Sequence, residues 1–322
     1  RRALFTQFEA PDARRFAPMF DEPSYKAEFR LSADVPAAMM PVSNTPVASE
    51  EQLGALKRVT FAPTPVMSSY LLFFGLGDFE RIAKPAAEGV EVGIVSPAGS
   101  GEQARFALDE LAPLVPYFND YFGQDYPLPK LDNIPGQSQF FGAMENWGAI
   151  FTFERILLVD PATTSARAKA QIYGTQAHET AHQWFGDLVT MAWWDDLWLN
   201  EGFASWMATK ATQEFHPEWY PLLTRVGGRE SAMSLDSYAT THPVVQEIRT
   251  VEQTNQAFDT ITYQKGAAVI SMLEAYAGED VWQRGLQRYM ADNKFSNAKT
   301  EDLWAAIEAA GASDLTGIAR DF

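Results

Sequence analysis

The most informative stretch of the chain is His178-Glu179-Thr180-Ala181-His182. Residues four apart stand above one another on one face of an α-helix, so the two histidines can each direct a ring nitrogen at one ion. Further along, the run Leu199-Asn200-Glu201-Gly202 offers a third ligand. Two histidines and a distal glutamate are typical of a catalytic zinc site. The pattern therefore predicts one zinc ion (Zn2+) held by His178, His182 and Glu201.

The flanking sequence predicts the two helices that would carry these ligands. The first is expected to begin at an N-cap among residues 163–165 and to stop near Gly186. The second is expected over about 196–215, with Asp195 or Asp196 as its cap and a His-Pro step as its end. Two antiparallel helices joined by a short connection would bring the three ligands to one point and leave a fourth position for water.

The alternative is an ordinary surface helix with two satisfied histidines. The chain has only four histidines, and two of them fall four apart with a glutamate in the catalytic position. This coincidence favours the metal site, although a short match of this kind is less specific by itself. His216 and His242 each precede a proline and are expected in loops, without a role in the site.

Three further segments surround the zinc motif in an informative order. They are Thr6-Gln7-Phe8-Glu9-Ala10 with the later Asp21-Glu22-Pro23, Gly142-Ala143-Met144-Glu145-Asn146, and Ile261-Thr262-Tyr263-Gln264-Lys265-Gly266-Ala267. Together with the zinc motif they closely resemble the M1 family of zinc aminopeptidases, which are aminopeptidase N-like gluzincins. The resemblance covers nearly the whole chain. It implies an α+β fold, in which a thermolysin-like zinc peptidase catalytic domain follows the end of a β-rich N-terminal domain.

The resemblance also implies an activity, the hydrolysis of the N-terminal peptide bond of peptides that have a free N-terminus. In that mechanism a zinc-activated water attacks the scissile carbonyl, and Glu179 is the general base. Tyr263 matches the tyrosine whose hydroxyl stabilises the oxyanion. Glu145 matches the carboxylate that holds the substrate's α-ammonium group. The other implied substrate-binding residues are Gln7, Glu9, Gly142, Ala143, Met144 and Asn146.

These assignments have a physical rationale and plainer alternatives. An enzyme specific for chain termini must recognise the free ammonium group, and an ionised carboxylate pairs with that group well. Without the resemblance, Glu145 would be assigned to a solvated loop, Glu9 to a half-buried strand and Tyr263 to core packing. Met144 could equally serve packing beside the amine site.

The charge and composition of the chain argue against several kinds of binding partner and of chemistry. The formal net charge of -17 argues against nucleic-acid binding, and it could help attract cationic peptide termini, although most such charges lie on solvated surface. No run of about 18 or more apolar residues is present, so no membrane span is expected. The absence of cysteine excludes disulfides and thiol catalysis but leaves the compartment open.

Two unequal parts are expected along the chain. Residues 1–83 alternate polar and apolar positions and are expected to be the C-terminal part of the N-terminal β-domain. Residues 84–322 are expected to form the catalytic domain. Its expected elements are a strand at 90–95, one helix at about 101–122, strands around 140–158 and then helices.

Residues typical of helix ends are expected at the boundaries of the later helices. Gly278 is expected to end the helix that carries Tyr263, while Thr300 caps and Gly311 closes a later helix. Members of the family usually continue into a helical C-terminal domain that roofs the active site. Either this chain is a fragment of a longer protein, or the missing N- and C-terminal domains are partners supplied elsewhere.

Three functions therefore compete. The first is the aminopeptidase. The second is a catalytically silent binding or scaffolding relative or fragment, and the third is a related zinc hydrolase, either an epoxide hydrolase or an endopeptidase. Cleavage that requires a free N-terminus separates the first from the others. The pocket around Gln7, Phe140, Phe141 and Met144 is mostly apolar in sequence, which predicts a broad preference for neutral or basic first residues over acidic ones.

Overall fold

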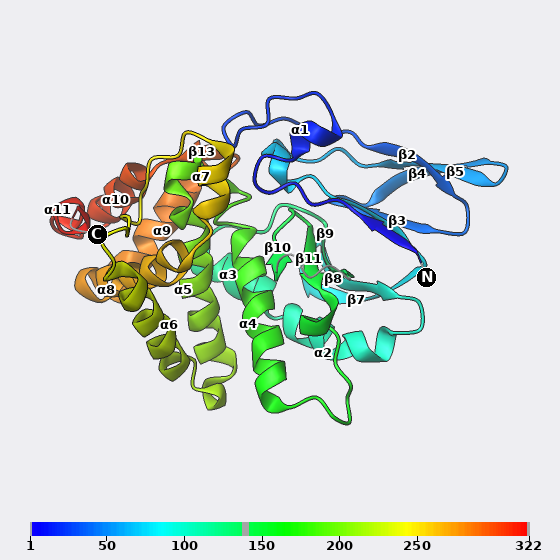
Figure 1. The fold of residues 1–322 in the computed structure, drawn as a ribbon. Coiled ribbons are helices and arrows are strands. Elements are labelled where there is room, and N and C mark those ends of the chain that lie inside the picture. Colours follow the sequence, from blue (N-terminus) through cyan, green and yellow to red (C-terminus); the bar gives the residue numbers. More distant parts are fainter. Residues whose placement is uncertain (1, 137–141, 321–322) are drawn as a thin grey trace.

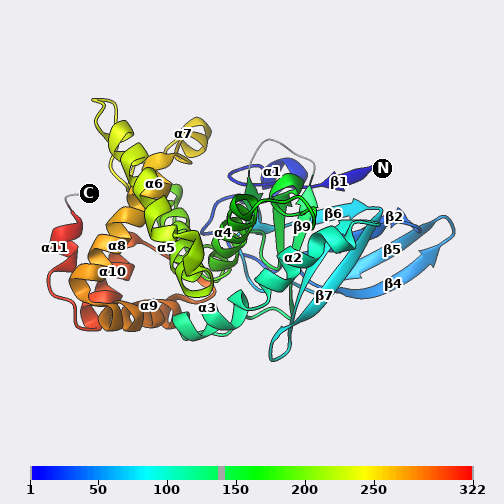
Figure 2. The ribbon, with the colours of Figure 1, turned by 90° about the horizontal axis from the view of Figure 1, so that it is seen from below.

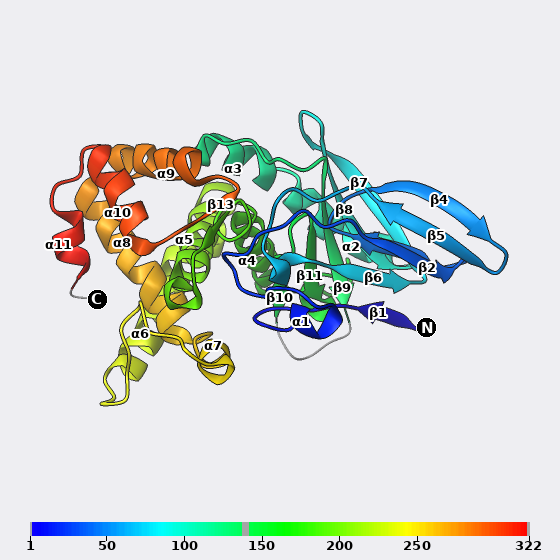
Figure 3. The ribbon, with the colours of Figure 1, turned by 90° about the horizontal axis from the view of Figure 1, so that it is seen from above.

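The computed structural model describes residues 2–136 and 142–320. Three regions follow one another across the molecule (Figure 1). Strands from the first part of the chain lie at one end, a mixed sheet lies in the middle, and helices fill the other end. Views from below and from above show the same order (Figures 2 and 3). The expected α+β class is confirmed.

The first part of the chain forms small antiparallel sheets. Its elements are β1 (Ala3–Phe5), α1 (Ala13–Phe16), β2 (Ser32–Pro36), β3 (Met40–Ser43), β4 (Val47–Leu53), β5 (Leu56–Phe61), the 3-10 turn η1 (Ser69–Leu71) and β6 (Phe74–Gly77). The strand orders are β1-β6-β3 and β2-β5-β4. A small hydrophobic core stabilises the second sheet. Val35, Val59 and Phe61 pack together in it, because alternate residues of a strand point to the same face of a sheet.

A five-stranded mixed sheet forms the middle of the described structure. Its strands are β7 (Phe79–Ala87), β8 (Val90–Pro97), β9 (Lys130–Gly136), β10 (Ala143–Met144) and β11 (Ala149–Phe153), in the order β10-β11-β9-β8-β7. β8, β9 and β11 run parallel, while β7 and β10 pair antiparallel at the edges. Residue 83 lies inside β7, so the boundary expected there falls within a strand of this sheet.

Strand β9 was not expected from the sequence, because polar residues interrupt its apolar pattern. All of its residues are nevertheless buried. Lys130 forms an ion pair with Asp132 at 3.0 Å, and Asn133 accepts a 2.6 Å hydrogen bond from the Thr152 hydroxyl. Paired polar groups can be buried at little net cost, whereas unpaired ones cannot.

The helix expected at 101–122 is two helices, α2 (Gly101–Leu111) and α3 (Leu114–Phe122). Pro113 separates them, because proline lacks a backbone N–H and restricts the residue before it. Gly123 ends α3 in the left-handed conformation with φ 60°. α2 packs against β7 and β8 and covers one face of the mixed sheet (Figure 2).

Two long helices lie side by side next to the sheet, α4 (Ala166–His182) and α5 (Trp198–Phe215) (Figure 1). They run antiparallel, as predicted. The Tyr173 hydroxyl contacts the Ala211 carbonyl at 3.4 Å near one end of the pair, and His178 contacts Glu201 near the other end. The connection between them contains β12 (Val189–Met191) and the 3-10 turn η3 (Trp194–Asp196).

The rest of the described chain is mainly helical. Its elements are η4 (Pro217–Trp219), α6 (Pro221–Asp236), α7 (Val251–Gln256), the π-helical turn η5 (Ile261–Lys265), α8 (Gly266–Ala277), α9 (Glu279–Asn293), β13 (Ser296–Ala298), α10 (Thr300–Ala309) and α11 (Leu315–Ala319). One further 3-10 turn, η2 (Glu154–Ile156), lies earlier in the chain, before α4. Gly278 follows α8 and Gly311 follows α10, both at positive φ, as predicted. The predicted cap of α10 was wrong. Thr300 is the first helical residue, and its hydroxyl donates to Asp196 at 2.6 Å.

One hydrophobic core joins the mixed sheet to these helices. Aromatic side chains are prominent in it: the Phe185 ring stacks on Phe203 at 4.3 Å, and Phe203 stacks on Trp282 at 6.4 Å. Burial of such a side chain contributes roughly 1.5–3 kcal/mol. Within the described residues, no helix combines the length and the apolar character required to cross a membrane.

Candidate active site

The ends of α4 and α5 bring the three predicted ligands together. α4 begins at the expected cap, because the Ser165 hydroxyl accepts a 3.2 Å hydrogen bond from the Ala168 N–H. It ends at His182, before the predicted stop at Gly186. The chain turns there because the His182 carbonyl accepts from the Asp187 N–H at 3.0 Å, and Gly186 supplies a φ of 136°.

The predicted caps of α5 were wrong. α5 begins at Trp198 after a 3-10 turn, and neither Asp195 nor Asp196 caps it. Asp195 instead accepts a 2.6 Å hydrogen bond from the Ile248 N–H, and Asp196 accepts from Thr300. Tertiary partners therefore use the carboxylates that the local sequence offered to the helix end. Glu201 still lies in the first turn of α5 and faces α4.

His178, His182 and Glu201 present three donor atoms at the corners of a small triangle. The two histidine Nε2 atoms are 3.0 Å apart, and Glu201 Oε2 lies 3.2 Å from His178 Nε2 and 3.4 Å from His182 Nε2. A tetrahedral ion with bonds of about 2.0–2.1 Å separates its ligand atoms by about 3.3 Å. The donor set and its spacing therefore fit a zinc ion.

Neighbouring groups orient both imidazoles. Nδ1 of His182 lies 2.9 Å from the Phe185 carbonyl oxygen, which accepts only, so Nδ1 carries the proton and Nε2 is left free to act as a ligand. Nδ1 of His178 lies 3.5 Å from the Ser205 hydroxyl on α5. The sequence did not identify either partner, because one is a backbone carbonyl and the other is an ordinary helical serine.

The pKa values of the two histidines shift in opposite directions. Burial lowers the pKa of His178 below its ordinary value. Burial also opposes protonation of His182, but the carboxylates of Glu145 and Glu201 outweigh it and raise the pKa of His182 well above its ordinary value. Burial acts against ionisation of Glu201, yet the two histidines lower its pKa to about 2. The raised pKa of His182 shows that the surrounding carboxylates favour a positive charge at this point, and the lowered pKa of Glu201 keeps its carboxylate ionised.

A second group of carboxylates lies beside the triangle, and we call Glu9, Glu145 and Glu179 the acidic cluster. Carboxylate oxygens of Glu145 and Glu179 and a ring nitrogen of His182 all lie within 4.8 Å of one another. Burial raises the pKa of all three glutamates, and repulsion from neighbouring carboxylates adds to the rise at Glu9 and Glu179. Among the described residues, Oε1 of Glu9 and Oε1 of Glu145 have no hydrogen-bond partner.

Tyr263 faces the triangle from the π-helical turn η5. Its ring lies 6.1 Å from that of His178 at an interplanar angle of 15°. Asp259 positions this turn, because its Oδ1 accepts from the N–H groups of Ile261 and Thr262 at 2.9 and 3.0 Å. Burial, reinforced by Glu201, raises the pKa of Tyr263 well above its ordinary value. Its phenol therefore stays protonated and can donate a hydrogen bond.

Close helix packing lets Tyr263 reach the site. A Cβ atom added at Gly202, next to Glu201, would meet backbone atoms of Gly266 at 3.3 Å and of Thr262 at 3.4 Å. A larger residue would push η5 and α8 away from α5. The helix that carries the third ligand is thus in direct contact with the turn that carries Tyr263.

A cleft of about 1730 Å³ gives access to all these groups. Most of the predicted site residues line it, namely Gln7, Glu9, Gly142, Ala143, Glu145, His178, Glu179, His182, Glu201 and Tyr263. Of the residues that the structure describes, Met144 and Asn146 were expected in the site but are fully buried and do not line the cleft. Phe140 and Phe141 lie outside the described residues.

The remaining histidines lie in loops, as predicted. His216 follows α5, where it contacts Glu110 at 2.8 Å and stacks on Trp219 at 3.8 Å. His242 contacts Asp259 at 2.8 Å and so touches the residue that positions Tyr263. This contact joins residues that are distant in sequence, which is why no local pattern indicated it.

Comparison with known proteins decides the family. Residues 106–322 match the Peptidase family M1 domain, and residues 1–71 match the Peptidase M1 N-terminal domain. The chain belongs to the M1 peptidase family. Membership agrees with the order of the segments around the zinc motif, and it places the M1 N-terminal domain before the M1 catalytic domain.

Relatives of this M1 chain include Aminopeptidase M1-D of Oryza sativa subsp. japonica, which is 44% identical over 94% of the chain and 35% of the relative. Probable aminopeptidase 2 of Sulfurisphaera tokodaii is 42% identical over 99% of the chain and 41% of the relative. Leucyl aminopeptidase of Saccharolobus solfataricus is 39% identical over 99% of the chain and 40% of the relative. The chain therefore spans roughly a third to two fifths of the length of these M1 relatives.

Two residues that hold the segments around this M1 site were not identified in the sequence. Asp259 precedes a helical run at a typical cap position, so helix-start rules could have found it. Gln183 directly follows the zinc motif and is fully buried, and its contacts with the Glu145 segment have no local sequence signal.

Proposed function

We propose that these residues form the catalytic centre of a zinc-dependent aminopeptidase, which hydrolyses the N-terminal peptide bond of peptides with a free N-terminus. One observation carries the proposal: among the described residues, Glu9 and Glu145 each keep a buried carboxylate oxygen without a hydrogen-bond partner, next to three atoms arranged as zinc ligands. The names of the M1 relatives, which are aminopeptidases, agree with this assignment.

His178, His182 and Glu201 would hold the zinc ion. Their donor types are those of a catalytic zinc site, and three protein ligands leave a fourth position open. When bound, zinc supplies Lewis-acid polarisation of the scissile carbonyl and lowers the pKa of water at the site. The Phe185 carbonyl holds His182 in the required tautomer before any metal arrives.

Glu145 and Glu9 would bind the α-ammonium group of the substrate. Each has a buried carboxylate oxygen without a hydrogen-bond partner in the described part of the chain. Burying like charges together is costly, and an incoming ammonium group relieves both the repulsion and the missing hydrogen bonds. The cluster would therefore recognise the one group that only a peptide N-terminus has.

Glu179 and Tyr263 would complete the chemistry. Glu179 would take a proton from the attacking water and return it to the leaving amine, and its raised pKa brings it closer to the pH at which such transfer is efficient. Tyr263 would donate its hydroxyl hydrogen to the oxyanion, because its raised pKa keeps the phenol protonated. Repulsion from the acidic cluster would disfavour acidic first residues relative to neutral or basic ones.

The test combines metal analysis with a matched pair of peptides. The complete natural chain should contain one zinc ion, cleave a dipeptide chromogenic substrate, and leave its N-acetylated counterpart intact. Glu179→Gln should retain zinc and lose turnover. Comparable cleavage of the acetylated peptide would support an endopeptidase, and a zinc-free, inert chain would support the silent binding relative.

A further inference from the structure

Residues 145–148 are a short buried segment between two strands, and we call them the Glu145 segment. β10 ends at Met144 and β11 begins at Ala149, so this segment lies outside the strand ladder. All four residues are buried. Buried backbone groups without ladder partners require hydrogen bonds from elsewhere. In this segment, several of those bonds come from buried side chains of distant elements.

Gln183 makes the bonds on the side of α4. Its Nε2 group donates to the Glu145 carbonyl at 3.0 Å and to the Glu179 carbonyl at 3.3 Å. Its Oε1 atom accepts from the Gly148 N–H at 3.0 Å and from the Tyr126 hydroxyl at 3.4 Å. The amide can point only one way, because one end faces two carbonyls, which only accept, and the other faces the Gly148 N–H, which only donates.

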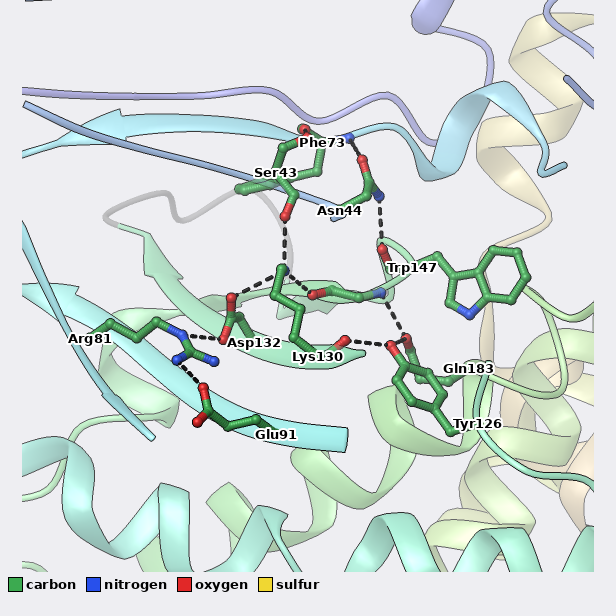
Figure 4. Close-up of polar contacts among 11 residues, drawn as sticks. Ser43, Asn44, Phe73, Arg81, Glu91, Tyr126, Lys130, Asp132, Trp147 and Gln183 are labelled. Carbon is green, nitrogen blue, oxygen red and sulfur yellow. Dashed lines mark hydrogen bonds and ion pairs between the residues drawn. The ribbon is translucent and has the colours of Figure 1, made fainter. Parts of the chain in front are cut away.

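The opposite side of the Glu145 segment is bound to the sheets (Figure 4). The Lys130 ammonium donates to the Gly148 carbonyl at 2.6 Å and to the Ser43 carbonyl at 2.9 Å. Asp132 balances its charge at 3.0 Å. Asn44, from the first part of the chain, donates to the Trp147 carbonyl at 2.9 Å. The segment is therefore held between the sheets and α4.

One amide thus connects the backbones of both functional glutamates. It holds Glu145, the proposed amine-binding residue, and Glu179, the proposed general base, and it directly follows the ligand His182 in the chain. We propose that Gln183 is a positioning residue that sets the separation between the amine-binding carboxylate and the metal ligands. This role rests on the proposed function, because it matters only if the amine and the metal bind the same substrate.

Loss of Gln183 is expected to change how tightly the site binds the substrate amine. Hydrogen bonds to the Glu145 and Glu179 carbonyls fix the carboxylate relative to α4 without touching the substrate. The hydrogen bond between this carboxylate and an ammonium group weakens steeply when its geometry changes. Loss of Gln183 should therefore weaken recognition of the amine while leaving the imidazole ligands and the zinc content unchanged.

The test uses two inhibitors that differ only in the amine, leucine hydroxamate and 4-methylpentanohydroxamate. Their dissociation constants are measured by calorimetry on the complete natural chain loaded with zinc, and the ratio of the two constants reports amine recognition. Gln183→Met should reduce this ratio about tenfold or more. Zinc stoichiometry should stay at the wild-type value.

The matched control is Gln176→Met. Gln176 is also fully buried, two turns earlier on α4, but its amide donates to the Ala107 carbonyl at 3.1 Å and accepts from Asn133 at 3.5 Å. This variant should lose stability and keep the wild-type ratio. Equal ratios in Gln183→Met and the wild type would overturn the positioning role.

A second variant tests the same role if Gln183→Met fails to fold. Gln183→Glu keeps the size of the side chain and an acceptor for the Gly148 N–H, but it places a carboxylate oxygen against the Glu145 and Glu179 carbonyls. It should lower the ratio as well, and an unchanged ratio would overturn the role. If the wild type itself binds both inhibitors equally, the proposed function fails, whatever the variants do.

Discussion

The Nε2 atoms of His178 and His182 lie 3.0 Å apart. Two ring nitrogens this close require either a proton or a cation between them. Because the Phe185 carbonyl accepts a hydrogen bond from Nδ1–H of His182, Nε2 is directed at the shared point. Glu201 completes the triangle with a carboxylate whose pKa is lowered to about 2. The geometry of this triangle fits the metal site that we propose.

Removing the metal should destabilise the protein as well as stop turnover. A cation at this point joins α4 to α5, and it stabilises the native state by about 4 kcal/mol at a thousandfold excess over its dissociation constant. We expect a chelator to lower the thermal midpoint and zinc to restore it. Calcium should fail to do so, because it prefers six to eight oxygen ligands. An unchanged midpoint would count against a shared ion.

Replacing Glu145 should weaken recognition of the substrate amine. Glu145→Gln removes the charge that pairs with the ammonium group, so the KM of an aminoacyl substrate should rise about tenfold or more. Glu218→Gln is the control, because Glu218 also lines the cleft but pairs with His216 at 3.1 Å. Steady-state kinetics on both variants check the prediction, and equal effects would show that only the charge of the cleft matters.

Removing the Tyr263 hydroxyl should affect turnover far more than binding. Tyr263→Phe should lower kcat by about 10²–10³, because the oxyanion loses one donor. The dissociation constant of a hydroxamate inhibitor should change little. Tyr220→Phe is the control, because Tyr220 lines the same cleft and is 69% exposed. A loss of affinity equal to the loss of kcat would assign Tyr263 to substrate binding instead.

Asp259 should act only through Tyr263. Asp259→Ala removes the acceptor for the N–H groups of Ile261 and Thr262, so kcat should fall about tenfold as η5 loosens. Asp259→Asn keeps an acceptor and should retain most of the activity. The double variant Asp259→Ala with Tyr263→Phe should be no slower than Tyr263→Phe alone. Additive losses would show that Asp259 has a separate function.

Lys26 should make stability depend on pH. Burial lowers the pKa of Lys26 to about 7, against the partial opposition of Asp187, while the ordinary value is 10.5. Between these values the unfolded state binds more protons, so the free energy of unfolding should rise with pH by up to about 1.4 kcal/mol per unit. Below pH 7 both states are protonated, and this slope disappears.

Urea midpoints between pH 7.5 and 9.5 check this prediction. The wild type should gain stability relative to Lys26→Met as the pH rises, because methionine does not titrate. Lys84→Met is the control, because Lys84 forms an ion pair with Asp109 at 2.8 Å and is 39% exposed. Parallel pH curves for the wild type and Lys26→Met would contradict a depressed lysine.

The sequence by itself predicted that His178, His182 and Glu201 come together, and the spacing of the two histidines is a local property of a helix. The order of the surrounding segments predicted the M1 family, and the comparisons confirm it. The ends of elements were less predictable. α4 stops at His182 rather than near Gly186, because the turn after it depends on contacts made by residues 185–187.

Tertiary structure alone decided which polar groups are buried and what they hold. β9 has no strand-like pattern and is stable because Lys130 pairs with Asp132 and donates to the distant Ser43 carbonyl, while Asp132 also pairs with Arg81. Asp195 and Asp196 bond distant residues rather than the start of α5. Gln183 is a neighbour of the zinc motif in sequence, yet its contact with Glu145 exists only because folding brings β10 to α4. Helical periodicity places ligands locally, whereas a hydrogen bond between distant segments requires the whole fold.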